Sequence, residues 1–171
     1  MSENPTFPKR AEHSIAAPTP TTDPDRSLTA IVYCESNFGG IDGKTANGLV
    51  RHSEKYQIRS IIDSENAGQD TGLILDNEPN GIPVVGDLTE ALTHAGKLPD
   101  YFIFGIAPAT GMLSVVERRL MLKAIELGMN IVNGLHEFLN DDPEFAAAAA
   151  RSNVVIRDIR RPRAKKDLRV F

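Results

Sequence analysis

Cysteine and long apolar runs are scarce in this sequence of 171 residues. The single cysteine, Cys34, cannot form a disulfide within the chain, and the sequence does not open with a basic segment followed by an apolar core. No uninterrupted apolar run approaches the roughly 20 residues that a membrane-spanning helix needs. We therefore expect a soluble, cytoplasmic protein with no membrane partner.

Several catalytic signatures are absent as well. No G-x-S-x-G segment provides a serine nucleophile, and His13, His52 and His94 have no metal-ligand spacing with Cys34, so we expect no metal site. The formal net charge of -4 and the pI near 5.6 do not favour a nucleic-acid partner. A basic C-terminal segment does not change this expectation, because it lacks interleaved aromatic residues.

The composition predicts one domain between two tails. With 41% hydrophobic residues, the chain can bury one sizeable core. Residues 1–28 are rich in proline, serine and threonine and predict a disordered tail. Residues 29–160 form the expected domain, and residues 161–171 form a basic tail or linker.

Short apolar runs alternate with segments of helical character from residue 28 onward. Such alternation is typical of βαβ units and a parallel sheet. A proline in the third run places it at the sheet edge, and the fourth run is the most apolar and predicts the centre. We expect an α/β fold with a doubly wound, mostly parallel, Rossmann-like sheet in three layers and strand order 3-2-1-4-5-6. The six expected strands are 30–34, 58–63, 82–85, 101–107, 131–132 and 154–157.

A glycine-rich loop follows the first expected strand and leads into a helix over about residues 44–55. Glycines let a backbone approach a phosphate, and the amides at a helix start favour anions. The spacing matches neither G-x-G-x-x-G nor the P-loop. The predicted cofactor-binding residues here are Gly39, Gly40, Gly43, Lys44 and Thr45. The alternative is a structural glycine turn with a solvated Lys44.

Two further strand ends carry candidate ligand contacts. Asp63 and Ser64 end the second strand, where a carboxylate accepts hydrogen bonds from a ribose in dinucleotide-binding proteins. The alternative is that they end the strand and cap the following loop. Ala107 and Pro108 follow the fourth strand, where small residues leave room for a ligand, or else simply form a tight turn.

The fifth strand ends in a segment that contains His136 and Glu137. A histidine and a carboxylate beside a ligand crevice are the best acid/base candidates in the chain. The alternative is that His136 is a hydrogen-bonded structural residue at a helix start.

Several segments together resemble the N-terminal Rossmann-like domain of the DgcN family. The resemblance extends from about Ala30 to Pro162, with the motifs in the same order. The segments that carry it are Asp42–Arg51, Ile62–Gly68, Asn80–Pro83, Gly105–Pro108, Gly134–Leu139 and Ile156–Arg160.

The resemblance implies an activity and a donor. It implies N-acetylation of D-glutamate or related D-amino acids, with acetyl-CoA as the donor. Family members continue into a second domain with a P-loop, and this chain ends where that domain begins. The expectation is therefore either a domain-length relative with its own role or a chain that works with a separate P-loop partner chain; we also expect a homo-oligomer.

Two segments, Gly81–Val84 and Ala124–Gly128, are also similar to the CoA-binding Rossmann domain of acyl-CoA ligases. That similarity favours CoA or another adenine nucleotide as the cofactor. Asp63 instead favours the free ribose diol of NAD, because a carboxylate repels a nearby phosphate. The leading hypothesis is a component of an N-acetyltransferase. The alternatives are a noncatalytic nucleotide-binding or regulatory module that needs a partner chain and, as the weakest, an NAD-dependent oxidoreductase.

Overall fold

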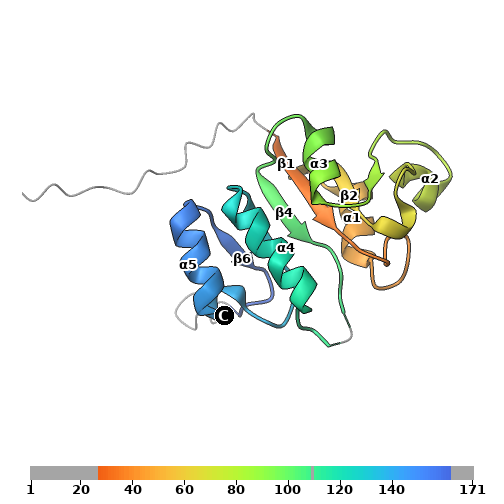
Figure 1. Cartoon of the computed structure of the whole chain (residues 1–171). Helices are drawn as coiled ribbons and strands as arrows, with labels where there is room; N and C mark the ends of the chain where they lie inside the picture. The colour runs from red at the N-terminus through yellow and green to blue at the C-terminus, as the bar shows by residue number, and fades with distance from the viewer. Residues whose placement is uncertain (1–26, 109, 163–171) are drawn as a thin grey trace, which may run out of the picture.

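A six-stranded parallel sheet forms the centre of the computed structural model (Figure 1), which describes residues 27–108 and 110–162. The strand order is β3-β2-β1-β4-β5-β6, so the predicted Rossmann-like order is confirmed. Most of each predicted tail, residues 1–26 and 163–171, lies outside the described residues. The strands are β1 (Leu28–Tyr33), β2 (Tyr56–Ile62), β3 (Val84–Val85), β4 (Tyr101–Phe104), β5 (Asn130–Asn133) and β6 (Ile156–Asp158).

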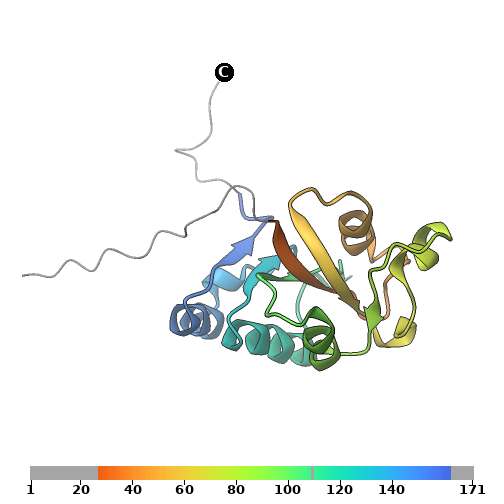
Figure 2. The same ribbon diagram turned by 90° about the horizontal axis from the view of Figure 1, so that it is seen from above.

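Helices cover both faces of this sheet. Figure 2 shows α3, α4 and α5 side by side on one face and α1 on the other, which gives the expected three layers. The α-helices are α1 (Lys44–His52), α2 (Thr71–Asp76), α3 (Leu88–Ala95), α4 (Val115–Glu126) and α5 (Pro143–Ser152), and two 3-10 turns are η1 (Ser64–Asn66) and η2 (Leu139–Asp141).

The helix α2 lies in the connection between β2 and β3. It has only six residues, too few for a clear helical period. Asp70 starts it, since its carboxylate accepts hydrogen bonds from the Gly72 and Leu73 amides at 2.8 and 3.2 Å. The same carboxylate also accepts from the Asn80 and Gly81 amides, so one side chain organises the whole connection to β3.

The fourth strand and the first helix each end three residues earlier than the sequence predicts. The fourth strand ends at Phe104 rather than at residue 107, because the Ala107 amide donates to the Asp42 carbonyl of another loop at 3.1 Å. The first helix ends at His52, and the Ser53 hydroxyl then accepts from the Tyr56 amide at 3.0 Å to start β2.

The core is built around β4, as the apolar fourth run predicts. All four residues of β4 are buried, and Tyr33 of β1 stacks with Phe104 at 5.4 Å between ring centroids. Met121, Ala124 and Ile125 give α4 its buried face. The strands β1 and β4 are the two central strands of the sheet, and the strand order reverses between their ends.

Gly105 tests how closely α1 packs against the sheet. A Cβ atom at this position would lie 2.6 Å from Val32 Cγ1 and 3.0 Å from Ala46 Cβ. We expect Gly105→Ala to lower the free energy of unfolding by about 1–3 kcal/mol through overpacking, as measured by denaturant unfolding.

Gly48→Ala is the matched control within α1. A Cβ atom there has no neighbour within 4 Å. It should raise stability by roughly 0.5–1 kcal/mol, because alanine loses less backbone entropy than glycine in a helix. Equal effects of the two substitutions would contradict the close packing at Gly105.

Candidate functional site

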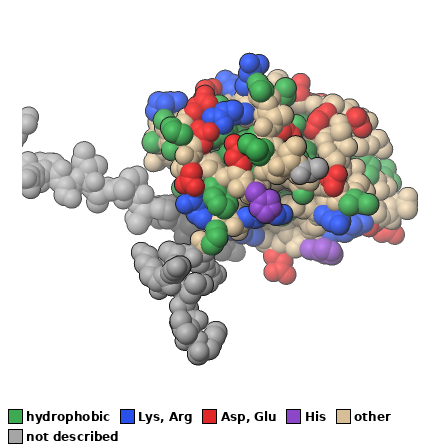
Figure 3. All heavy atoms as spheres, turned by 90° about the horizontal axis from the view of Figure 1, so that it is seen from below, with side chains coloured by type: hydrophobic (Ala, Val, Ile, Leu, Met, Phe, Trp, Pro, Cys, Tyr) green, Lys and Arg blue, Asp and Glu red, His purple; other side chains and the backbone are tan. Residues whose placement is uncertain are grey.

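The predicted site residues all lie at one edge of the sheet. Because the strands are parallel, the loops that follow β1, β2, β4 and β5 emerge at their shared carboxyl ends. Figure 3 views this edge and shows a histidine side chain near its middle with basic side chains close by. The edge holds two separate arrangements, a glycine loop and a pocket.

The glycine loop, residues 35–43, is held by the carboxylate of Asp63. This buried side chain accepts hydrogen bonds from the Ser36 and Phe38 amides, both at 3.1 Å, which fixes the loop over the end of β2. It also accepts from the Glu65 amide and the Asn66 side chain. With both oxygens in use, Asp63 serves the loop and η1 in this structure, and a ribose contact stays a prediction.

Ser64 is exposed and forms hydrogen bonds with the side chain of Glu35 in the glycine loop. Its hydroxyl and its amide both donate to the Glu35 carboxylate, the amide at 2.9 Å. Asp63 and Ser64 therefore both connect the end of β2 to the loop after β1.

Close backbone packing explains why glycines occupy this loop. A Cβ atom at Gly43 would lie 2.2 Å from the Asn37 carbonyl oxygen, and Gly39 has a φ of +81°. Asn47 of α1 accepts from the Gly39 amide and donates to the Gly40 carbonyl, both at 3.1 Å. The turn itself therefore requires glycine at positions 39 and 43, whether or not the loop binds a ligand.

The start of α1 differs from the starts of the other described α-helices. No side chain caps it at Gly43, whereas a side chain of Asp70, Asp87, Ser114 or Asp142 caps each of the others. Lys44 and Thr45 are exposed in the first turn. The free amides of an uncapped helix start attract anions, and a lysine beside them adds positive charge.

A pocket of about 230 Å³ lies on the other side of β4. It holds three of the predicted residues, Ala107, Pro108 and His136, and brings the loops after β4, β5 and β6 together. Its lining is Ala107, Pro108, Thr110, Gly111, Gly134, Leu135, His136 and Arg160. Neither the glycine loop nor Asp63, Ser64 or Glu137 lines it.

Arg160 is the functional candidate that the sequence does not single out. Its guanidinium lies 2.9 Å from Nε2 of His136, between the loops after β5 and β6. In the sequence it is one of many basic residues near the C-terminus, and only the meeting of β5 and β6 places it in the pocket. An arginine only donates hydrogen bonds, so His136 Nε2 accepts here.

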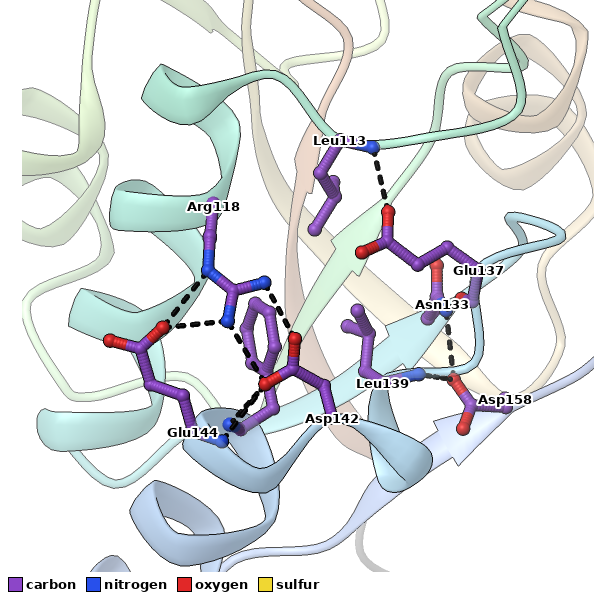
Figure 4. Close-up of polar contacts among 9 residues, drawn as sticks. Leu113, Arg118, Asn133, Glu137, Leu139, Asp142, Glu144 and Asp158 are labelled. Carbon is purple, nitrogen blue, oxygen red and sulfur yellow. Dashed lines mark hydrogen bonds and ion pairs between the residues drawn. The ribbon is translucent and has the colours of Figure 1, made fainter.

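Glu137 does not line the pocket, and its side chain joins two loops. Its carboxylate accepts from the Leu113 amide at 3.0 Å, which ties the start of the α4 region to the end of β5 (Figure 4). Arg118 nearby bonds to both Asp142 and Glu144 and joins α4 to α5. The contact with the Leu113 amide gives Glu137 a structural partner, and its acid/base role stays a prediction.

Asp158 of β6 holds the loop that carries His136. Its carboxylate accepts from the Asn133 side chain at 2.8 Å and from the Leu139 amide at 3.0 Å (Figure 4). The amide and side chain of Asn140 donate to it as well. Burial alone would raise the pKa of Asp158, but these hydrogen bonds outweigh it and lower the pKa.

Cys34 lies beneath the glycine loop and is buried. Burial, followed by the negative charge of Asp63, raises its pKa to about 12. The thiol is therefore protonated at neutral pH, which excludes it as an acyl-accepting nucleophile in this conformation. Among the described residues, no cluster of histidine, cysteine, aspartate and glutamate is arranged to hold a metal ion.

A larger hollow of about 560 Å³ lies at the opposite edge, beside Thr29, Gln57 and Gly96. It contains none of the predicted residues and sits at the amino ends of the strands. Ligands of open α/β sheets bind at the carboxyl ends, so we place the candidate site there despite the smaller volume. Within residues 27–108 and 110–162, no helix is long and apolar enough to cross a membrane.

Asp63→Asn tests whether hydrogen bonds to the Asp63 carboxylate fix the glycine loop. Asparagine places a donor group against amides that need an acceptor, so we expect a loss of about 1–3 kcal/mol in the free energy of unfolding. Hydrogen exchange should become faster at the Ser36 and Phe38 amides. Asp42→Asn, at an exposed position of the same loop, should change neither quantity.

The lowered pKa of Asp158 predicts a stability that depends on pH. A carboxyl with a lower pKa in the folded state contributes stability above its unfolded pKa of about 3.9, and that contribution is lost as the pH falls through the folded value. Unfolding curves measured from pH 6 to pH 3 should show a smaller decline for Asp158→Asn than for the unaltered chain. Parallel declines would refute this role.

Curated relatives match part of this chain. A D-glutamate N-acetyltransferase from Tritonibacter scottomollicae is 32% identical over 60 residues, which are 35% of this chain and 18% of the relative. A D-glutamate N-acetyltransferase from Pseudoalteromonas sp is 35% identical over 85 residues, 48% of this chain and 26% of the relative. The matched region is thus at most about a quarter of these relatives' length.

A solved structure matches more of the chain. The crystal structure of a DUF1611 family protein from Anabaena variabilis has a TM-score of 0.72 and 29% identity, over 84% of this chain and 40% of that one. The family described as a domain of unknown function (DUF1611_N), a Rossmann-like domain, matches residues 64–162. The predicted resemblance to DgcN-type D-glutamate N-acetyltransferases is confirmed at this level, and the chain belongs to the DUF1611_N family of Rossmann-like domains.

Proposed function

We propose that this chain is the Rossmann-like component of an N-acetyltransferase that acts on D-glutamate or a related amino acid, with acetyl-CoA as donor. One observation carries the proposal: an uncapped helix start and a small pocket that contains His136 and Arg160 lie at the same carboxyl edge of the sheet. The two curated relatives that match it are D-glutamate N-acetyltransferases. A transferase of this kind needs one place for a phosphate-bearing donor and another for a small acceptor.

The donor phosphates belong at the glycine loop in this proposal. The first amides of α1 and the Lys44 ammonium supply positive charge there, and Thr45 adds an exposed hydroxyl. The loop joins the pocket through one backbone contact, the Ala107 amide on the Asp42 carbonyl at 3.1 Å. A thioester arm that leaves the glycine loop along this contact would lead past Ala107 and Pro108.

The acceptor amine must lose a proton as its nitrogen attacks the thioester carbonyl and the CoA sulfur leaves. His136 is the lining residue with a ring nitrogen able to take that proton. In the structure its Nε2 is engaged by Arg160, so Arg160 must shift before the ring can act as a base.

Completion of the active site by further protein, such as a P-loop domain or chain, is part of this proposal. The chain matches only 40% of the solved relative's length. Exposed apolar side chains occur in the loops at the same edge, including Ile41 at 77% and Met112 at 60% exposure. Exposed apolar side chains in neighbouring loops are typical of a surface that meets another protein surface.

Thermal unfolding with CoA, acetyl-CoA, ATP, NAD and NADP tests the donor site. A ligand that binds only the folded state stabilises it by about 2.7 kcal/mol at 100 times its dissociation constant. We expect CoA and acetyl-CoA to raise the melting temperature and Lys44→Ala to abolish the rise. Lys97→Ala, at the opposite edge of the sheet, is the control and should leave it intact.

Other outcomes have distinct meanings. Stabilisation by NAD alone would replace the transferase with a dinucleotide-dependent activity. If none of the five compounds stabilises the chain, it lacks a self-sufficient donor site. A CoA effect that persists in Lys44→Ala would move the donor site away from the glycine loop.

A further inference from the structure

We propose that the pocket beside β4 binds a carboxylate of the amino-acid acceptor through Arg160, so that Arg160 selects acidic or α-carboxylate-bearing substrates. The inference rests on the proposed function for the kind of ligand, but the site itself rests on the geometry of the pocket.

Arg160 differs from Arg51, Arg118 and Arg161 in its partner. Arg51 pairs with Asp76, Arg118 with Asp142 and Glu144, and Arg161 with Asp141. Arg160 has no such carboxylate among the residues that the structure describes, and its recorded contact is a histidine ring. A guanidinium that lines a pocket without a carboxylate partner is suited to take one from a ligand.

The contact with His136 orients the guanidinium but occupies only part of its hydrogen-bond donors. Arginine carries five N–H donors, and the contact to Nε2 involves only the NH1 group. A ring that accepts at Nε2 is neutral and carries its proton on Nδ1. The positive charge of Arg160 is therefore not cancelled, and most of its donors remain available for a two-point contact with a carboxylate.

The walls of the pocket suit a small ligand. At about 230 Å³ it is below the usual size of sites for drug-like molecules. A Cβ atom at Gly111 would lie 3.5 Å from His136 Cδ2, so the missing side chain keeps the space over the ring open. Gly111 also has a φ of +68°, which favours glycine at that place.

Nearby acidic groups do not compete for the same space. The Glu137 carboxylate is turned to the Leu113 amide, and the Asp158 carboxylate is surrounded by donors from Asn133, Leu139 and Asn140. Neither residue lines the pocket. An incoming carboxylate would therefore face Arg160 with no acidic side chain among the pocket-lining residues.

Calorimetric binding of D-glutamate to the purified chain, with no CoA present, tests the proposal. We expect Arg160→Gln to weaken binding at least tenfold, since charge-assisted hydrogen bonds to a carboxylate are lost. The affinity of Arg160→Lys should lie between those of the unaltered chain and Arg160→Gln, because lysine keeps the positive charge but cannot form the two parallel hydrogen bonds of a guanidinium. Arg161→Gln removes the same charge one residue away and should leave the affinity within about twofold.

Two more ligands identify the carboxylate. D-Glutamine keeps only the α-carboxylate and glutarate keeps two carboxylates without the amine. Loss of binding for D-glutamine would assign Arg160 to the side-chain carboxylate, whereas retained binding would assign it to the α-carboxylate. Equal affinity of the unaltered chain and Arg160→Gln for every ligand would overturn the proposal.

Nitrogen NMR of His136 gives an independent readout. The free chain should show the tautomer protonated at Nδ1, and D-glutamate should change the Nε2 signal as Arg160 turns to the ligand. An unchanged ring signal at saturating D-glutamate would place the ligand elsewhere. CoA binding without D-glutamate binding would refute this inference alone, while the reverse would leave it standing and refute the donor site.

Discussion

The carboxylate of Asp63 is the group on which the glycine-loop half of the candidate site depends. It is fully buried at the end of β2 and accepts four hydrogen bonds, two from the glycine loop and two from η1. A buried carboxylate is costly unless donors surround it, so the loop and the charge stabilise each other. Because the loop leads directly into α1, the position of the uncapped helix start follows from this one side chain.

A second carboxylate, that of Asp158, orders the loop after β5 in the same way. Asp158 collects amides and side chains from the segment between β5 and η2, and this segment carries His136. The edge is thus two loops, each organised by an acid at the end of a neighbouring strand. Acids at such positions order loops as readily as they bind ligands, and the difference lies in where their oxygens point.

That difference sets the limit of what the sequence predicts. The strand order and the sheet centre follow from apolar runs such as Tyr101–Phe104, because burial on both faces leaves a clear pattern. The location of Asp63 also follows, since it ends a strand. The sequence also offers its capping of the following loop as an alternative. Its hold on the glycine loop is not predicted, because it depends on the Ser36 and Phe38 amides, which the fold brings from the loop after β1. Arg160 is hidden for the same reason: its pocket forms only where β4, β5 and β6 lie side by side.

The outer edge of β2 is only partly covered by β3. The strand β3 pairs with β2 only at Ile61 and Ile62, so among residues 27–108 and 110–162 no strand lies beside the outer edge of the first part of β2. Open edges invite pairing between molecules, and charged side chains and irregular register discourage it. The pairing of β2 with β1 skips Arg59, a charged residue in that open stretch. Arg59 thus places a positive charge where the ladder is irregular, and both features oppose pairing of this open stretch with another molecule.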